Sequence, residues 1–148
     1  MSRFLAIVFC LLFSCSAFAA EPLFIILEPG QGSALLKQCS RPTPQNVSGF
    51  WRPELSQIQE LEAALPAFIN GDPQGKLLRP LTEFKRQYIG FIQDGKKYIY
   101  GNFYLSGSRK TEISKTAVIV CDGGASFWGV VYSVEGKAFQ NLAFNGVA

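Results

Sequence analysis

Residues 86–105 read RQYIGFIQDGKKYIYGNFYL, and this stretch decides the fold. Asp94-Gly95 is a favoured dipeptide for a two-residue type I′ turn, and the flanking residues are rich in aromatic and β-branched types. Such a turn fixes the register of a hairpin, with these predicted pairs: Phe91 with Tyr98, Gly90 with Ile99, Ile89 with Tyr100, and Tyr88 with Gly101. Both faces of the hairpin carry apolar side chains. We therefore expect it to be covered on both sides, or to expose one side as an aromatic contact surface.

One main helix is predicted before the hairpin, at residues 54–69. Its apolar residues recur at helical spacing and form a single stripe: Leu55, Ile58, Leu61, Leu65 and Phe68. Pro53 suits the first turn, and Glu54 places negative charge at the positive end of the helix dipole. Pro66 is expected to kink or end the helix near Leu65.

Short apolar runs predict the other strands, at residues 23–27, 116–121, 127–134 and 137–144. Residues 40–53 contain three prolines and are expected to form a loop that packs onto the domain. A helix followed by four or five antiparallel strands is an α+β pattern. We expect one main helix on a four- to five-stranded antiparallel sheet, in the element order of cystatin-like folds.

Residues 1–19 have the three parts of a secretory signal peptide. Arg3 supplies positive charge, an unbroken apolar run follows, and an Ala-Phe-Ala sequence ends at Ala19. The apolar run is shorter than the roughly 20 residues that a membrane-spanning helix needs. We predict cleavage after Ala19 and a single exported α+β domain, residues 20–148, in the periplasm or outside the cell. A retained membrane anchor, or a lipoprotein modified at Cys15, is the alternative.

Cleavage removes Cys10 and Cys15 and leaves Cys39 and Cys121. Two cysteines in an oxidising compartment predict one disulfide. In the chain-entropy model, a disulfide that closes a loop of this length stabilises the folded state by roughly 4 kcal/mol. A free reactive thiol beside a buried one is the alternative. No Cys-x-x-Cys motif supports a thioredoxin-like role.

The sequence contains no histidine, which excludes Ser-His-Asp and Cys-His catalysis and removes the commonest transition-metal ligand. The acidic residues are scattered and form no calcium-loop pattern. We therefore expect no metal site and no cofactor. The formal net charge of +3, to which Arg3 contributes, is too weak for a nucleic-acid-binding surface.

Cys121-Asp122-Gly123-Gly124 is the most distinctive local motif. Asp122 could present a carboxylate there, or the glycines could form an anion-binding nest. A turn between two strands accounts for the same residues, because Asp and Gly suit turn geometry. Ser126 follows, but no spacing supports a Ser–Lys catalytic pair.

Aromatic side chains could form a binding surface, since Tyr and Trp are favoured anchors at interfaces. The candidates are Phe91, Tyr98, Tyr100, Tyr104, Trp128 and Tyr132. The same residues would serve as core in a sheet that is covered on both sides. The predicted binding residues are Tyr98, Tyr100, Asp122, Trp128 and Tyr132.

Four strings occur along the chain: CSRP at residues 39–42, GFWRP at 49–53, VCDGG at 120–124 and LAFNG at 142–146. Together they resemble small exported proteins of Gram-negative bacteria. The resemblance covers most of the chain after the signal peptide. It implies an exported location and carries no mechanism.

These observations favour a non-enzymatic periplasmic protein of binding, inhibitor or immunity type that acts by protein–protein contact. Its expected partner is a protein of the envelope or of a competing bacterium, with no nucleic acid involved and no transmembrane segment. A carrier of a small apolar ligand is the first alternative. An envelope hydrolase that uses carboxylates or a Ser–Lys pair is the second.

Overall fold

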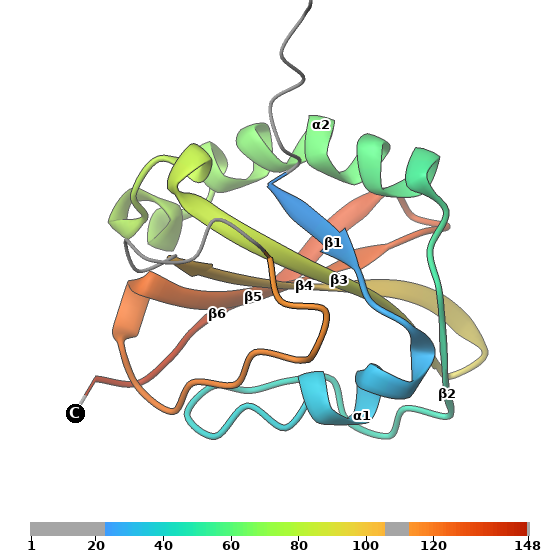
Figure 1. Cartoon of the computed structure of the whole chain (residues 1–148). Coiled ribbons are helices and arrows are strands. Elements are labelled where there is room, and N and C mark those ends of the chain that lie inside the picture. The colour runs from blue at the N-terminus through green and yellow to red at the C-terminus, as the bar shows by residue number, and fades with distance from the viewer. Residues whose placement is uncertain (1–22, 106–112, 148) are drawn as a thin grey trace, which may run out of the picture.

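The predicted hairpin forms the centre of the sheet in the computed structural model, which describes residues 23–105 and 113–147 (Figure 1). Strands β3 (Phe84–Gln93) and β4 (Lys96–Leu105) pair in the predicted register, with Phe91 opposite Tyr98. Asp94 and Gly95 both have positive φ, as a type I′ turn requires. The predicted signal peptide lies outside the described residues.

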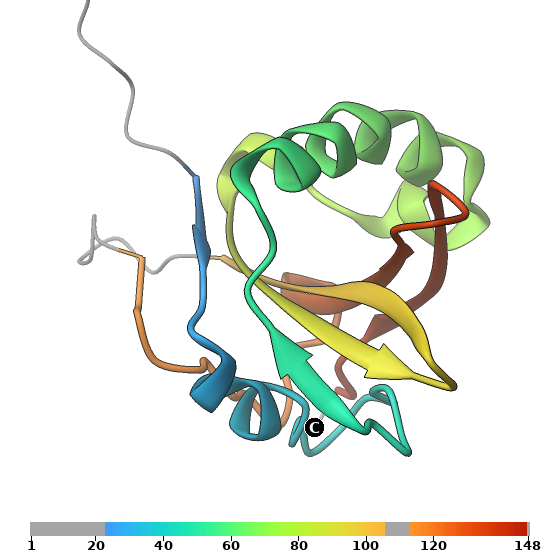
Figure 2. The same cartoon turned by 90° about the vertical axis from the view of Figure 1, so that its right-hand side faces the viewer.

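Four further strands complete a six-stranded sheet: β1 (Phe24–Ile26), β2 (Gly49–Trp51), β5 (Phe127–Ser133) and β6 (Ala138–Phe144). The order is β1-β3-β4-β5-β6, and β2 also pairs with β3. Strand β1 runs parallel to the first half of β3, while β2 runs antiparallel to the second half (Figure 2). The two short strands thus share one edge of β3.

The α+β class is confirmed, but the expected antiparallel sheet of four or five strands under one helix is wrong. The sheet is mixed, and two strands precede the main helix. Part of the predicted loop at residues 40–53 is β2, because Gly90 leaves room on β3 for the Trp51 indole. A side chain at position 90 would collide with that ring.

The described residues contain two α-helices, α1 (Gly32–Leu35) and α2 (Leu55–Gly71), rather than one. Four short 3-10 turns accompany them, at Pro29–Gln31, Pro73–Leu77, Leu81–Glu83 and Gly124–Ser126. Of the two effects expected of Pro66, a kink or the end of the helix, the second is wrong, because α2 continues past Pro66 to Gly71. Ile69 is buried beyond Pro66, and Phe68 stacks on Phe139 with ring centroids 4.9 Å apart, so packing continues through the proline.

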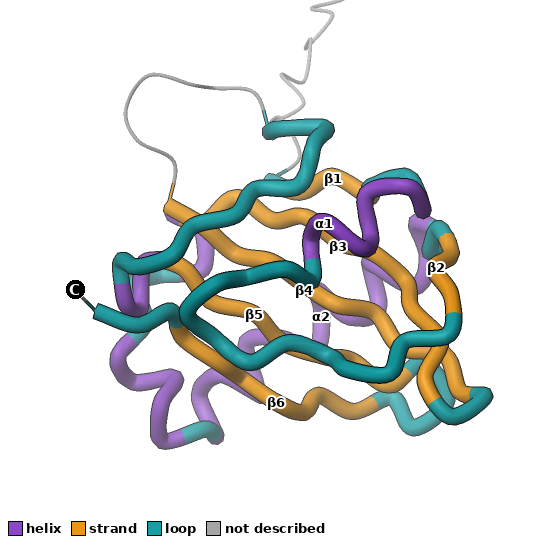
Figure 3. Tube along the Cα trace, turned by 90° about the horizontal axis from the view of Figure 1, so that it is seen from below, coloured by secondary structure: helices purple, strands orange, loops and turns teal. Residues whose placement is uncertain are grey.

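Both faces of the sheet are covered, as Figure 1 and Figure 3 show. Helix α2 packs on one face, where Ile58, Leu61 and Leu65 meet Phe103 and Trp128 in an apolar core. Helix α1 and irregular segments, including 36–48 and 113–123, cross the other face over a smaller core. We call these the helix face and the coil face.

The predicted strand at residues 116–121 is wrong, although its backbone groups are well satisfied. Gln87 donates to the carbonyl oxygens of Ser114 and Thr116 at 2.8 and 2.7 Å, and it accepts from the Val118 N–H at 2.9 Å. Asn102 donates to the Val118 carbonyl at 3.0 Å. Strands β4 and β5 pair directly, so this segment finds no strand edge there and binds amide side chains that rise from the sheet.

Candidate functional site

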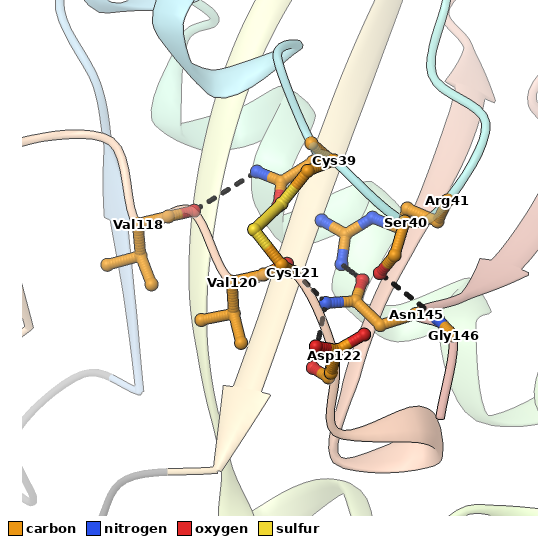
Figure 4. The surroundings of a disulfide bond; sticks show 10 residues. Cys39, Ser40, Arg41, Val118, Val120, Cys121, Asp122, Asn145 and Gly146 are labelled. Atoms are coloured by element: carbon orange, nitrogen blue, oxygen red, sulfur yellow. Dashed lines mark hydrogen bonds between the residues drawn. A yellow bond between two sulfur atoms is a disulfide. The ribbon is translucent and has the colours of Figure 1, made fainter. Parts of the chain in front are cut away.

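The predicted disulfide between Cys39 and Cys121 is confirmed, with an S–S distance of 2.03 Å (Figure 4). It joins the segment that follows α1 to the irregular segment 113–123. Both segments belong to the coil face. The disulfide therefore ties two stretches of that layer to each other, although they are 82 residues apart in sequence.

Three of the four sequence strings meet beside the disulfide (Figure 4). The Gly146 N–H donates to the Ser40 carbonyl at 3.1 Å, and the Gly124 N–H donates to the Gly146 carbonyl at 3.0 Å. The Asn145 side chain donates to the carbonyl oxygens of Val120 and Asp122 at 2.6 and 3.2 Å. The strings at 39–42, 120–124 and 142–146 thus form one hydrogen-bonded cluster.

Arg41 is the buried charge of this cluster, with 5 % of its surface exposed. Its Nε donates to the Tyr100 hydroxyl at 3.0 Å, its Nη1 to Asn145 Oδ1 at 2.7 Å, and its Nη2 to Asn102 Oδ1. All three acceptors are neutral. Within residues 23–105 and 113–147, no carboxylate lies within ion-pair distance of Arg41.

Gly129 makes room for this arrangement on the sheet. A Cβ atom at position 129 would collide with the Tyr100 hydroxyl and would lie 3.1 Å from Arg41 Nε. The absence of a side chain on β5 therefore lets the guanidinium and the phenol lie directly over the strand. Burial raises the pKa of Tyr100, and the neighbouring Arg41 charge partly opposes that rise.

A pocket of about 450 Å³ lies beside this cluster, within the size range of small-ligand sites. One wall is the loop 42–45 that follows Arg41, another is the stretch 140–143 of β6, and Gln93 also lines it. Tyr100 and Val131 contribute from the coil face of the sheet. Four of the lining residues carry side-chain amides: Gln45, Gln93, Gln140 and Asn141.

Strand β6 is irregular where it lines the pocket. Gly129 pairs with Ala143 and Val131 pairs with Gln140, so β6 contains one extra residue between these pairs. Asn141 lies in that bulge with a φ of 56°, a left-handed conformation that is uncommon for a residue with a side chain. Backbone strain of this kind is often found at binding sites.

The structure does not bring the predicted aromatic residues together in one exposed surface. Trp128 is fully buried on the helix face, where it stacks on Phe103 at 3.6 Å. Tyr132 is buried on the same face, and its hydroxyl donates to Glu60 at 3.1 Å. Tyr100 lies buried on the coil face, where the half-buried Tyr98 also packs, stacked on Phe91.

Asp122 is exposed, and the geometry after it is that of a turn. Gly123 and Gly124 have φ values of 103° and 52°, a conformation that glycine adopts without steric cost. Ser126 ends the short 3-10 turn that follows. In the described part of the chain, no hydrogen bond joins Ser126 to a lysine.

Sequence reasoning missed the polar cluster beside the pocket, which consists of Arg41, Asn102 and Asn145 together with Tyr100. Arg41 and Asn145 lie within two of the strings, at CSRP and LAFNG, but neither string has the spacing of a known motif. Their association depends on contacts between residues 104 positions apart. Only the two strings themselves marked these positions in advance.

No protein-family model, no curated protein and no solved structure matches this chain. Among residues 23–105 and 113–147, no helix is long and apolar enough to span a membrane. In the same residues, no group of three cysteine or acidic side chains is placed to hold a metal ion.

Proposed function

We propose that this chain is an exported, non-catalytic binding protein that acts by contact with a partner protein, as an inhibitor or immunity-type protein does. The pocket between loop 42–45 and the bulged strand β6 is the centre of the contact surface. The observation that carries the proposal is the pocket's position beside a buried Arg41 that has no described ionic partner. We therefore place the proposed contact surface at the rim of this pocket, rather than at the tyrosines predicted from the sequence.

The loop that forms one wall is held in place before any partner binds. Thr43 Oγ1 donates to the Leu36 carbonyl at 2.6 Å, and Gln93 donates to the Gln45 carbonyl at 2.6 Å. Pro42 and Pro44 restrict the backbone, and Cys39 anchors the start of the segment. A wall that is already ordered loses little conformational entropy on binding, which favours recognition of a defined partner surface.

The chemistry of the pocket lining supports binding over hydrolysis. Tyr100 is the one ionisable side chain among the lining residues, and its raised pKa keeps the phenol protonated at neutral pH. General acid–base catalysis near neutral pH uses groups with a pKa close to the working pH. Amide and aliphatic side chains supply most of the remaining lining, and such groups position ligands by hydrogen bonding and packing.

An exported location, in the periplasm or outside the cell, is part of the proposal. The disulfide is typical of proteins in an oxidising environment, and the sequence of residues 1–19 predicts a secretory signal. Together these features support a role in the periplasm or outside the cell, where toxins and lytic enzymes are encountered.

Carriage of a small ligand is the second candidate function, favoured by the pocket volume of about 450 Å³. The amide-rich lining suits a polar ligand better than the apolar ligand that the sequence suggested. A carrier of this kind would retain its ligand through purification, and mass spectrometry of the native protein would detect it.

Affinity capture with matched variants tests the proposed function. Oxidised residues 20–148, which contain every described element, are immobilised and exposed to envelope and culture-fluid extracts. Gln140→Glu alters an exposed pocket residue, and Gln59→Glu makes the same change on the exposed side of α2. We expect one stoichiometric protein partner that the wild type and Gln59→Glu retain and Gln140→Glu loses. A partner retained equally by all three proteins would place the contact surface elsewhere, and the lack of any partner would contradict the proposal.

A further inference from the structure

Tyr100 has a hydroxyl hydrogen that the described protein does not use. The hydroxyl oxygen accepts a hydrogen bond from Arg41 Nε, and a guanidinium has only donors. The Tyr100 hydrogen therefore points away from Arg41, and among residues 23–105 and 113–147 the hydroxyl donates no hydrogen bond. Tyr100 is 2 % exposed and lines the pocket. A buried donor without an acceptor is costly. The hydroxyl of Tyr104 and the indole N–H of Trp128 likewise donate no hydrogen bond within the described part of the chain, but neither residue lines the pocket, whereas Tyr100 does and a ligand there can supply the acceptor.

The charge of Arg41 determines which acceptor fits best. Three of its five N–H groups donate to neutral oxygens, and no anion compensates it within the described residues. Arg41 directly precedes Pro42, the first residue of the pocket wall, and it polarises the Tyr100 hydroxyl by donating to the phenol oxygen. Hydrogen bonds that involve a charged partner are shorter and stronger than neutral ones, so this donor favours an anionic oxygen.

We infer that the pocket binds a carboxylate, and that one carboxylate oxygen accepts a hydrogen bond from Tyr100. The side-chain amides of Gln45, Gln93, Gln140 and Asn141 line the same pocket and can pair with amide groups beside the carboxylate. The ligand class is therefore an acylated amino acid, either free or as the carboxyl terminus of a polypeptide. This inference rests on the proposed function, because it names the group that a partner would insert.

A titration with paired probes tests the inference directly. Isotope-labelled oxidised residues 20–148 are titrated with N-acetylglycine and with its neutral analogue N-acetylglycinamide, and side-chain amide signals are followed by NMR. We expect the acid to bind about 10-fold more tightly than the amide, because a charge-assisted hydrogen bond is stronger than a neutral one. The signals of Gln45, Gln140 and Asn141 should shift together.

Substitution of one tyrosine at a time identifies the donor. Tyr100→Phe keeps the ring and removes the hydroxyl, and it should lower the affinity for the acid about 10-fold and the affinity for the amide by less, so that the preference for the acid shrinks. Tyr98→Phe is the matched control, because Tyr98 lies on the same strand and face outside the pocket lining. If Tyr100→Phe fails to fold, Gln140→Glu replaces it. The added negative charge should weaken binding of the acid and leave the amide unaffected.

Three results would overturn the carboxylate site: equal affinity for acid and amide, no binding of either probe at millimolar concentration, or unchanged acid binding by the Tyr100 and Gln140 variants.

A tripeptide with a free carboxyl terminus distinguishes the two sources of the carboxylate, a free acylated amino acid and the end of a polypeptide. If it binds at least 10-fold more tightly than N-acetylglycine, the natural ligand is a chain terminus; if the two are equal, it is a free acid. Acid binding without a captured protein would reject the proposed protein contact and keep the carboxylate site. A captured protein without acid binding would reject the carboxylate site and keep the proposed protein contact.

Discussion

The two faces of the sheet are held by different forces. On the helix face, α2 satisfies its own backbone hydrogen bonds, so contact with the sheet consists mainly of apolar side chains, and Leu61, Phe103 and Trp128 belong to the same core. On the coil face, an irregular segment has backbone groups that no strand can pair. Gln87 and Asn102 satisfy them, and a disulfide closes the layer. An irregular layer thus needs buried polar side chains as hydrogen-bond partners for its backbone. The buried Arg41 and the pocket lie in that layer.

Removal of the disulfide should have the largest effect and should distinguish the faces most clearly. Cys39→Ala combined with Cys121→Ala should lower the free energy of unfolding by about 4 kcal/mol, because the unfolded chain regains the entropy of a long closed loop. Denaturant unfolding measures the loss. Hydrogen exchange should show that residues 113–121 lose protection before β3 and β4 do. A uniform loss of protection over both faces would contradict the division that we describe.

Leu61→Ala tests the helix face and should lower the free energy of unfolding by about 3 kcal/mol, because it leaves a cavity in a fully buried apolar core. Denaturant unfolding checks this value. The carboxylate affinity of the pocket should remain that of the wild type, since the substitution lies on the other side of the sheet. A coupled loss of affinity would show that the two faces are not independent.

Asn102→Ala is the polar counterpart on the coil face. It removes an acceptor of Arg41 and the donor to the Val118 carbonyl, so buried polar groups lose their partners. We expect a loss of about 2 kcal/mol in the same unfolding experiment, with increased exchange at residues 114–118. A loss below about 0.5 kcal/mol, the size of a surface substitution, would show that amide contacts do not hold this layer.

The smallest effect is a pH dependence at the edge of the helix face. Hydrogen bonds from Lys137 and Tyr132 lower the pKa of the Glu60 carboxyl group below its ordinary value. A carboxyl group whose pKa is lower in the folded state stabilises the fold above its unfolded pKa, and this contribution disappears as the pH falls through the folded pKa. The melting temperature of the wild type should exceed that of Glu60→Gln slightly at pH 7. The difference should shrink by pH 3, and a constant difference would contradict the assignment.

Local patterns predicted the elements whose information lies within a few neighbouring residues. The Asp94-Gly95 turn fixed the register of β3 and β4, because a two-residue turn leaves one way to align the strands. The apolar stripe from Leu55 to Phe68 located α2, and the two cysteines outside the predicted signal peptide predicted the disulfide. The turn and the helix can each be recognised in a short stretch of sequence, and the disulfide can be recognised from the number of cysteines.

The errors lie where a segment had more than one possible partner. Residues 116–121 have the composition of a strand, but β4 pairs with β5 instead. Trp51 and its neighbours have the composition of a loop, but Gly90 on β3 admits them as strand β2. Composition describes what a segment can form, and competition among distant segments determines what it pairs with.

The sequence by itself determined the α+β class, the central hairpin, the long helix and the disulfide, because turn chemistry and periodicity act locally and two cysteines leave only one possible pair. The tertiary structure alone decided which tyrosines are core and which one lines the pocket. It also joined Arg41 to Tyr100, Asn102 and Asn145, residues that are 59 to 104 positions away along the chain. The physical reason is that a buried charge takes its acceptors from whatever the fold brings within about 3 Å, and a single sequence does not record that distance.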